Sequence, residues 1–314
     1  MTVNGFLTKT KIGLYCPAGD FYLDPSVGVK RALVSHAHGD HAVANHAEVY
    51  CTNPTKSIME YRHGIKMFTE FKVVDFKRRF RVQEVDVTFI PAGHMLGSAQ
   101  ILMEYSGEKY LYTGDFKIQE DGSCEAFEFQ ECDYLITETT FASPDYSHPE
   151  PIQVLKELEN EKVNVVIGAY SVGKAQRITQ LITNHFSEMP LYIHPEIIPY
   201  HQIYSKHGIN LGLWQPYRRV EFKEQKQSFF IVSPSQFMRF SRNKNVLKVF
   251  ATGWKNSYYA CDKILSISDH ADWNDLLLLI KNSKAKKVFT VHGDGSDLIN
   301  HFKGSDTAVV ELSK

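Results

Sequence analysis

The stretch "RALVSHAHGDHA", residues 31–42, joins a short apolar run to a cluster of polar side chains. "RALVS" has the composition of a buried strand, and it runs directly into His36, His38, Asp40 and His41. Imidazole nitrogens and carboxylate oxygens are good ligands for Zn²⁺, and alternate residues at the end of a strand can direct two imidazoles at one ion. Asp40 and His41 can then serve a second ion, so the stretch predicts a metal site at the end of a strand.

Three later segments repeat this arrangement of a strand followed by a small residue and a potential ligand. "VTFIPAGH" ends at His94, "KYLYTGD" at Asp115 and "KVFTVH" at His292. With the first cluster they supply five imidazoles and two carboxylates, the right number for two adjacent ions with one bridging carboxylate. Two ions roughly 3.5–4 Å apart can bind a hydroxide nucleophile and steady the oxygens of a phosphoryl group. The predicted metal ligands are His36, His38, Asp40, His41, His94, Asp115 and His292.

Phosphoryl chemistry of this kind also needs a general acid for the leaving oxygen. We predict His270 in "SISDHADW", with Glu138 in "LITETTF" as the carboxylate that orients it and keeps it protonated. A structural or substrate-contacting histidine is the alternative. Asp24 in "FYLDPS" is predicted to accept a hydrogen bond from a ligand imidazole, with an Asx turn at Pro25 as the alternative. The predicted catalytic residues are therefore Asp40, His270 and Glu138.

The stretch "VNVVIGAYSVGKAQRI", residues 163–178, is close to the phosphate-binding loop of nucleotide hydrolases. Ala175 stands where that loop needs a hydroxyl to hold Mg²⁺, which argues against an NTPase. Small residues that lead into a helix still expose backbone amides to an anion. We therefore predict that Ser171, Gly173 and Lys174 contact a phosphate of the substrate, with a plain turn and a solvated Lys174 as the alternative.

Length and composition indicate an ordinary soluble protein. The 314 residues suit two domains or one elaborated domain, and 43% are hydrophobic. The apolar runs are too short to span a membrane and no secretory signal is visible, so we expect a cytoplasmic location. Five cysteines without a C-x-x-C spacing argue against a disulfide scaffold and against a cysteine zinc site.

The charge of the chain is unevenly distributed, although its net value is −1. The window of residues 200–260 holds ten Lys and Arg but only two Glu, a net charge of +8, and is dense in aromatic residues. Basic groups mixed with aromatic rings suit a polyanion with stackable bases. The whole chain alternates strand-like and helix-like segments, which predicts an α/β fold.

Taken in order, these motifs resemble the metallo-β-lactamase superfamily. Glu138 in "ETTF", His270 in "SDHAD" and His292 in "VHG" narrow the resemblance to the β-CASP nucleases, which cut phosphodiester bonds in DNA or RNA. "GLYCPAGDFYLDP", "SHAHGDHA", "PAGHMLGSAQ", "TGDFK", "GKAQR" and "SDHADW" look most like the ligase-associated DNA exonucleases of bacteria. The resemblance covers nearly the whole chain.

The resemblance implies a division of the ligands between two ions. His36, His38 and His94 would hold one metal, Asp40, His41 and His292 the other, and Asp115 would bridge them. It also implies a metallo-β-lactamase αββα sandwich with an inserted β-CASP-type α/β cap domain. Residues 1–149 and 258–314 would form the sandwich, and residues 150–257 the cap, which contains most of the basic window.

The function implied by the resemblance is that of a metal-dependent DNA exonuclease in DNA repair. It would use two divalent ions, Zn²⁺ or alternatively Mn²⁺, and act on single-stranded DNA with a functional link to DNA ligase and helicase. A β-CASP-type ribonuclease acting on RNA is the main alternative, because a histidine at position 292 is more usual among RNA-cleaving members. A small-ester or thioester hydrolase of the same fold, or a scaffold without activity, are the others.

Overall fold

The computed structural model describes residues 2–64, 69–224, 226–240, 242–256 and 259–312. These residues form two compact units. The first comprises residues 1–120, 124–147 and 270–314, and the second comprises 121–123 and 148–269. Most of the second unit is thus inserted into the sequence of the first. Within the described part of the chain, no helix is long and apolar enough to cross a membrane.

The first unit contains two sheets of seven strands. The first sheet follows the chain order and is built from β1 (Thr2–Val3), β2 (Leu7–Thr10), β3 (Gly13–Cys16), β4 (Phe21–Leu23), β5 (Arg31–Leu33), β6 (Glu48–Cys51) and β7 (Glu70–Val73). Strands β1 to β4 pair antiparallel, whereas β4 to β7 pair parallel. The parallel half therefore places the carboxyl end of β5 beside those of its neighbours, where the first ligand cluster begins.

The second sheet of this unit has the order β20-β19-β12-β11-β10-β9-β8. Its strands are β8 (Arg79–Val82), β9 (Val85–Pro91), β10 (Ala99–Tyr105), β11 (Glu108–Tyr112), β12 (Tyr134–Thr139), β19 (Lys287–Gly293) and β20 (Ala308–Glu311). β9 and β11 both pair antiparallel with β10 and so point the same way. β12 pairs parallel with β11, β19 with β12 and β20 with β19, so five strands of this sheet end at one edge.

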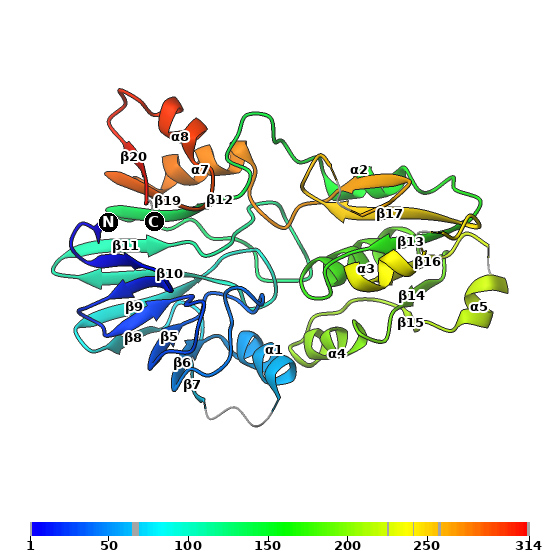
Figure 1. Cartoon of the computed structure of the whole chain (residues 1–314), viewed down its shortest axis with the longest axis horizontal. Coiled ribbons are helices and arrows are strands. Elements are labelled where there is room, and N and C mark those ends of the chain that lie inside the picture. Colours follow the sequence, from blue (N-terminus) through cyan, green and yellow to red (C-terminus); the bar gives the residue numbers. More distant parts are fainter. Residues whose placement is uncertain (1, 65–68, 225, 241, 257–258, 313–314) are drawn as a thin grey trace. The chain divides into compact units, whose positions relative to one another are not determined.

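Alternation of side chains along the strands explains how the two sheets pack. Leu33 in one sheet and Val87, Phe89 and Ile101 in the other belong to a single buried cluster between the sheets. The outer faces are covered by helices: α1 (Asn53–His63) on the first sheet, α7 (Trp273–Ser283) and α8 (Ser296–His301) on the second. Figure 1 shows α7 and α8 lying over β12 and β19. This layering is αββα, and the predicted fold class is confirmed.

The second unit is a parallel sheet of six strands in the order β15-β14-β16-β13-β17-β18. Its strands are β13 (Asn164–Gly168), β14 (Leu191–Ile193), β15 (Gln215–Pro216), β16 (Phe229–Val232), β17 (Val246–Thr252) and β18 (Lys263–Ser266). Its helices are α2 (Pro151–Lys156), α3 (Lys174–His185), α4 (Ile198–Lys206), α5 (Arg219–Glu224), α6 (Pro234–Phe237) and the 3₁₀ turn η1 (Met238–Phe240). The predicted α/β character of the insertion is thus seen in its sheet.

The boundaries of the inserted unit differ from those predicted. It begins at His148 rather than at residue 150, and it ends at Asp269 rather than at residue 257. The reason is β18, which pairs parallel with β17 and completes the sheet of the second unit. The sequence "GWKNSYYACDK", which ends the basic window, suggested the earlier boundary. The chain nevertheless adds one more strand, β18, to the sheet of the second unit before that unit ends at Asp269.

Candidate metal centre

The strand directions bring most of the predicted ligands to one edge of the first unit. His94 follows β9, Asp115 follows β11, and His292 is the penultimate residue of β19; these three strands point the same way. His36 and His38 follow β5 in the facing sheet. Ligands from four separate parts of the sequence can therefore converge only because the two sheets pack face to face.

Gly114 allows the chain to turn from β11 into Asp115. Its φ of +55° lies in the left-handed region, and a Cβ atom added there would lie 2.7 Å from the Oγ of Ser35. A larger residue would therefore push the loop that carries Asp115 away from the loop that carries His36. The glycine in "TGDF" is thus required by the close approach of two ligand loops.

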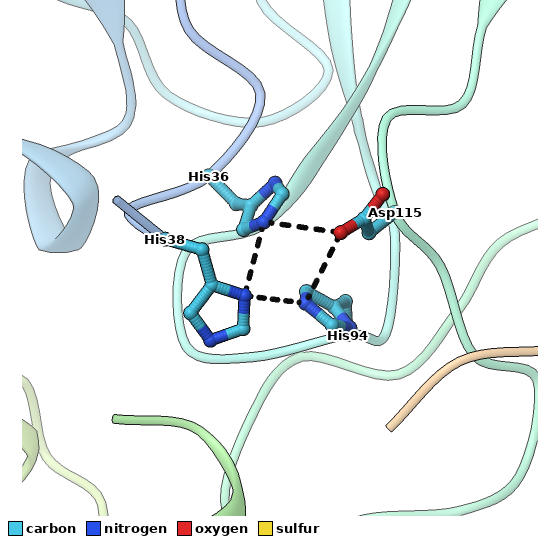
Figure 2. Close-up of side chains that lie close together, drawn as sticks. All are labelled: His36, His38, His94 and Asp115. Atoms are coloured by element: carbon cyan, nitrogen blue, oxygen red, sulfur yellow. Dashed lines mark hydrogen bonds and ion pairs between the residues drawn. The ribbon is translucent and has the colours of Figure 1, made fainter. Parts of the chain in front are cut away.

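Four side chains form the centre of the cluster: His36, His38, His94 and Asp115. Figure 2 shows them pointing toward one another. The His38 Nδ1 atom lies 3.2 Å from the Nε2 of His36 and 2.9 Å from the Nε2 of His94. The Oδ2 atom of Asp115 lies 3.5 Å from the His36 Nε2 and 3.9 Å from the His94 Nε2. All four atoms lie within 4.8 Å of one another.

These distances fit a divalent metal ion. A tetrahedral ion bound at about 2.0–2.1 Å holds neighbouring ligand atoms roughly 3.3 Å apart, and the four observed separations bracket this value. Burial and the positive charge of His41 hold the pKa of His36 well below its usual value, so its nitrogen keeps a lone pair for a metal. The donor set of three imidazoles and one carboxylate is typical of Zn²⁺.

His41 lies beside this group and is fixed by Asp24. Its Nδ1 donates to the Asp24 Oδ2 at 2.8 Å, and its Nε2 lies 3.4 Å from the Asp115 Oδ2. Although burial lowers the pKa of His41, Asp115 and Asp24 raise it well above its usual value. The hydrogen bond to Asp24 holds a proton on Nδ1 and turns Nε2 toward Asp115. Carboxylates outside a metal site commonly orient ligand imidazoles in this way.

The remaining predicted ligands, Asp40 and His292, both lie close to His41. Asp40 is largely exposed, and its Oδ2 lies 3.7 Å from the His41 Nε2. The ring centroids of His41 and His292 are 5.3 Å apart, and His292 has a left-handed backbone with φ of 51°. The assignment of these three residues to a second ion stays a prediction.

The predicted acid pair also forms at this edge. The Nδ1 of His270 lies 2.8 Å from the Oε2 of Glu138 and 4.0 Å from the Oδ2 of Asp115. Glu138 is buried within β12 and accepts further hydrogen bonds from the Phe116 backbone N–H and the Thr140 hydroxyl. His270 is partly exposed, so the buried Glu138 fixes its ring while part of the ring stays accessible to solvent.

Two residues at the site were missed by sequence reasoning. The hydroxyl of Ser35 donates to the Asp24 Oδ2 and lies 3.0 Å from the Nδ1 of His36, while the Tyr112 hydroxyl donates to Asp24 at 3.0 Å. Asp24 is therefore fixed by three separate side chains, including His41. Ser35 stands next to the first ligand and could have been found from its position, whereas Tyr112 is connected to Asp24 only through packing of the two sheets.

The predicted phosphate contact at Lys174 has a different environment from the one expected. Lys174 is buried, and its ammonium donates to the Ile267 carbonyl at 2.7 Å and lies 3.2 Å from the Asp269 Oδ2. Arg177, one turn along α3, is also buried and contacts Asp269 at 3.5 Å and Asp121 at 3.4 Å. We call Lys174, Arg177, Asp121 and Asp269 the buried clamp, since they bind the end of the second unit to α3.

The turn before α3 is held by a side chain from the first turn of that helix. Gln176 accepts a hydrogen bond from the Gly173 N–H at 2.7 Å and donates to the Ser171 carbonyl at 3.0 Å. Its amide also contacts the buried His201. The phosphate contact predicted for Ser171 and Gly173 stays a prediction. Lys174 is left out of it, because its ammonium binds the Ile267 carbonyl and Asp269 inside the second unit.

Two family models match the chain. The Beta-lactamase superfamily domain matches residues 22–168, which include every ligand from His36 to Asp115. The Zn-dependent metallo-hydrolase RNA specificity domain matches residues 260–304, which include His270 and His292. The chain belongs to the metallo-β-lactamase superfamily. The fold, the ligand cluster and the order of the ligands in the sequence agree with this membership.

Curated relatives connect the chain to proteins that act on nucleic acids. A "Probable DNA ligase" of Opitutus terrae is 33% identical over an alignment of 304 positions, which covers 91% of this chain and 29% of that protein. An "RNase J-like protein" of Methanocaldococcus jannaschii is 26% identical, and the match covers 85% of this chain and 82% of that protein. The "Endoribonuclease ysh-1" of Neurospora crassa is 26% identical over 51% of this chain and 24% of its own length.

A solved structure has the same fold. A protein of unknown function from Enterococcus faecalis V583 aligns with a TM-score of 0.62 over 90% of this chain and 79% of its own, at 14% identity. This likeness concerns the fold alone. The chain spans less than a third of the length of the Opitutus relative, so that protein contains much that this chain does not share.

Proposed function

We propose that this protein is a metal-dependent nuclease that hydrolyses phosphodiester bonds, and that single-stranded DNA is its preferred substrate. The observation that carries the proposal is the position of one carboxylate oxygen. The Asp115 Oδ2 lies between 3.4 and 4.0 Å from nitrogens of four histidines, His36, His41, His94 and His270. A shared carboxylate flanked by two groups of donors is the arrangement expected of a two-metal phosphodiesterase.

The side chains of the site have separate tasks in this proposal. When bound, two divalent ions, Zn²⁺ by preference, would supply a hydroxide nucleophile and stabilise charge on the phosphoryl oxygens. Asp24 keeps the His41 imidazole turned toward Asp115. Glu138 accepts a hydrogen bond from the Nδ1–H of His270, so the proton that the imidazolium gives to the leaving oxygen is the one on Nε2.

The second unit supports a nucleic-acid substrate. Its window of residues 200–260 carries a net charge of +8, which suits the phosphates of a strand. The Opitutus match supports DNA, because a segment like this chain occurs within a protein described as a DNA ligase. The same match motivates a functional link to ligation in DNA repair, and we further propose exonucleolytic digestion and a cytoplasmic location. A link to a helicase is a further part of the proposal.

RNA is the second candidate substrate. The RNA specificity domain model matches residues 260–304, and the RNase J-like relative is matched over most of its length. Matched DNA and RNA strands labelled at either end would decide between the two. We expect metal-dependent cleavage with DNA digested faster than RNA. Faster RNA cleavage would reverse the preference, and no cleavage of either strand would reject the proposal of a nuclease.

The general acid makes a prediction of its own. His270→Ala should lower kcat by about 10²–10⁴, the usual contribution of a positioned acid, while bound metal stays unchanged. Glu138→Gln should lower kcat less, because the amide leaves the His270 ring without its carboxylate partner but does not remove the ring itself. His185, an exposed histidine at the end of α3, provides the control variant His185→Ala. Normal cleavage by His270→Ala would contradict its role.

A further inference from the structure

The two faces of the second unit's sheet are covered unequally. One face, which carries Val165 and Ile167, packs against α2, α3 and α4. The opposite face carries Val166 and Phe230 and is covered by the short elements α5, α6 and η1. A cavity of about 730 Å³ opens on this second face. Its size lies in the range of small-ligand pockets, roughly 300–1,000 Å³.

Aromatic rings form the inner wall of this cavity. Tyr217 stacks on Phe230 with ring centroids 3.9 Å apart and planes at 10°. Phe222 and Phe240 contact Phe230 at centroid distances of 5.5 and 5.7 Å. All four rings line the cavity, and Tyr217 and Phe240 are only partly buried. A planar ligand can therefore pack on rings that already hold one another in place.

The charged residues that line the cavity all carry the same sign. Arg219 and Lys223 lie four residues apart on α5, and Arg239 comes from η1. All three are exposed, and none has an ion pair among the described residues. No Asp or Glu is among the described residues that line the cavity. Three cations without a carboxylate partner favour an anionic ligand, and guanidinium groups suit phosphate in particular.

Polar groups near the cavity complete its lining. The amide side chains of Gln236, Asn243 and Asn245 line it and can donate to and accept from the edge of a base. Glu196 is the nearby acid, but its carboxylate accepts hydrogen bonds from Ser233 and Gln236 and is not part of the lining. The cavity therefore combines ring faces, amides and cations within one folded unit.

We propose that this cavity binds one nucleotide unit, with its phosphate on Arg219, Lys223 and Arg239 and its base on the rings of Tyr217 and Phe240. The choice of ligand rests on the proposed nuclease function. The same chemistry has two sources: the terminal nucleotide of a bound strand, or a free mononucleotide released from it. In either case the site lies in the second unit and is built without any of the metal ligands.

Calorimetry with deoxyadenosine 5′-monophosphate tests the proposal on the full chain. We expect the monophosphate to bind more tightly than deoxyadenosine or inorganic phosphate, because the rings and the cations act together. Arg219→Ala and Arg239→Ala should each weaken binding by about ten- to a hundredfold, the effect of a charge-assisted hydrogen bond. The matched control is Arg218→Ala, since Arg218 is an exposed neighbour on the chain that pairs with Glu221 and does not line the cavity. Equal losses in Arg218→Ala and Arg219→Ala, or no binding of the monophosphate, would overturn the site.

Digestion assays separate the two sources. If the cavity takes a strand end, Arg219→Ala will slow digestion of strands with a terminal phosphate but not of strands with a hydroxyl at that end. If it takes released product, added monophosphate will inhibit the unmodified protein and not Arg219→Ala. Both outcomes support the site. Because calorimetry requires no cleavage, a protein that binds the monophosphate but cuts no strand would reject the nuclease proposal and leave the site standing.

Discussion

Asp115→Asn is expected to abolish detectable cleavage and to remove at least one bound metal ion. Losing one group that stabilises transition-state charge costs about 10²–10³ in kcat, and Asp115 would serve both groups of ligands, so we expect a loss of at least about a thousandfold. The physical reason is the charge of this carboxylate. Burial alone would raise the pKa of Asp115, but His41 and His270 hold it well below its usual value, so the carboxylate is fully ionised among the imidazoles.

Metal content measured after dialysis checks this expectation independently of activity. The unmodified chain should retain up to two Zn²⁺ ions, and Asp115→Asn should retain one or none. Asp294→Asn is a suitable control, because Asp294 is exposed, lies next to β19 and belongs to no cluster of possible ligands among the described residues. Two retained ions in Asp115→Asn would contradict the bridging position and would require a different set of ligands.

The central ligands could be predicted from the sequence because of where they stand on their strands. His36, His94 and Asp115 each come shortly after an apolar strand, and small residues precede His94 and Asp115. Strands of one sheet that point the same way must end at the same edge, which brings His94 and Asp115 together, and the packing of the facing sheet then adds His36. Glu138 and His270 were predicted with less support from the residues alone, and the resemblance to β-CASP nucleases singled them out.

The buried clamp could not be predicted in the same way. Lys174 follows a glycine at the start of α3, and in the sequence it has the pattern of an exposed phosphate contact. Its partner Asp269 stands 95 residues later, and only the return of the chain through β18 brings the two together. The same return explains why the end of the inserted unit was predicted too early. Long-range pairing of this kind leaves no local signal in the sequence.

Lys174→Met should destabilise the second unit by about 3–5 kcal/mol, the cost of removing one partner from a buried ion pair. The reason is that Asp269 would remain buried with Arg177 as its main cationic partner, at 3.5 Å. Urea unfolding followed by tryptophan fluorescence would measure the change, because Trp214 and Trp254 both belong to this unit.

Lys263→Met provides a matched control for this change. Lys263 forms an ion pair with Glu157 at 2.6 Å in the same unit, but both side chains are substantially exposed. Its removal should cost no more than about 1 kcal/mol, since exposed pairs are solvated and screened. Equal destabilisation by the two variants would contradict the buried clamp. A Lys174→Met protein of normal stability that binds strands weakly, with a reduced salt dependence, would instead return Lys174 to the role of a phosphate contact.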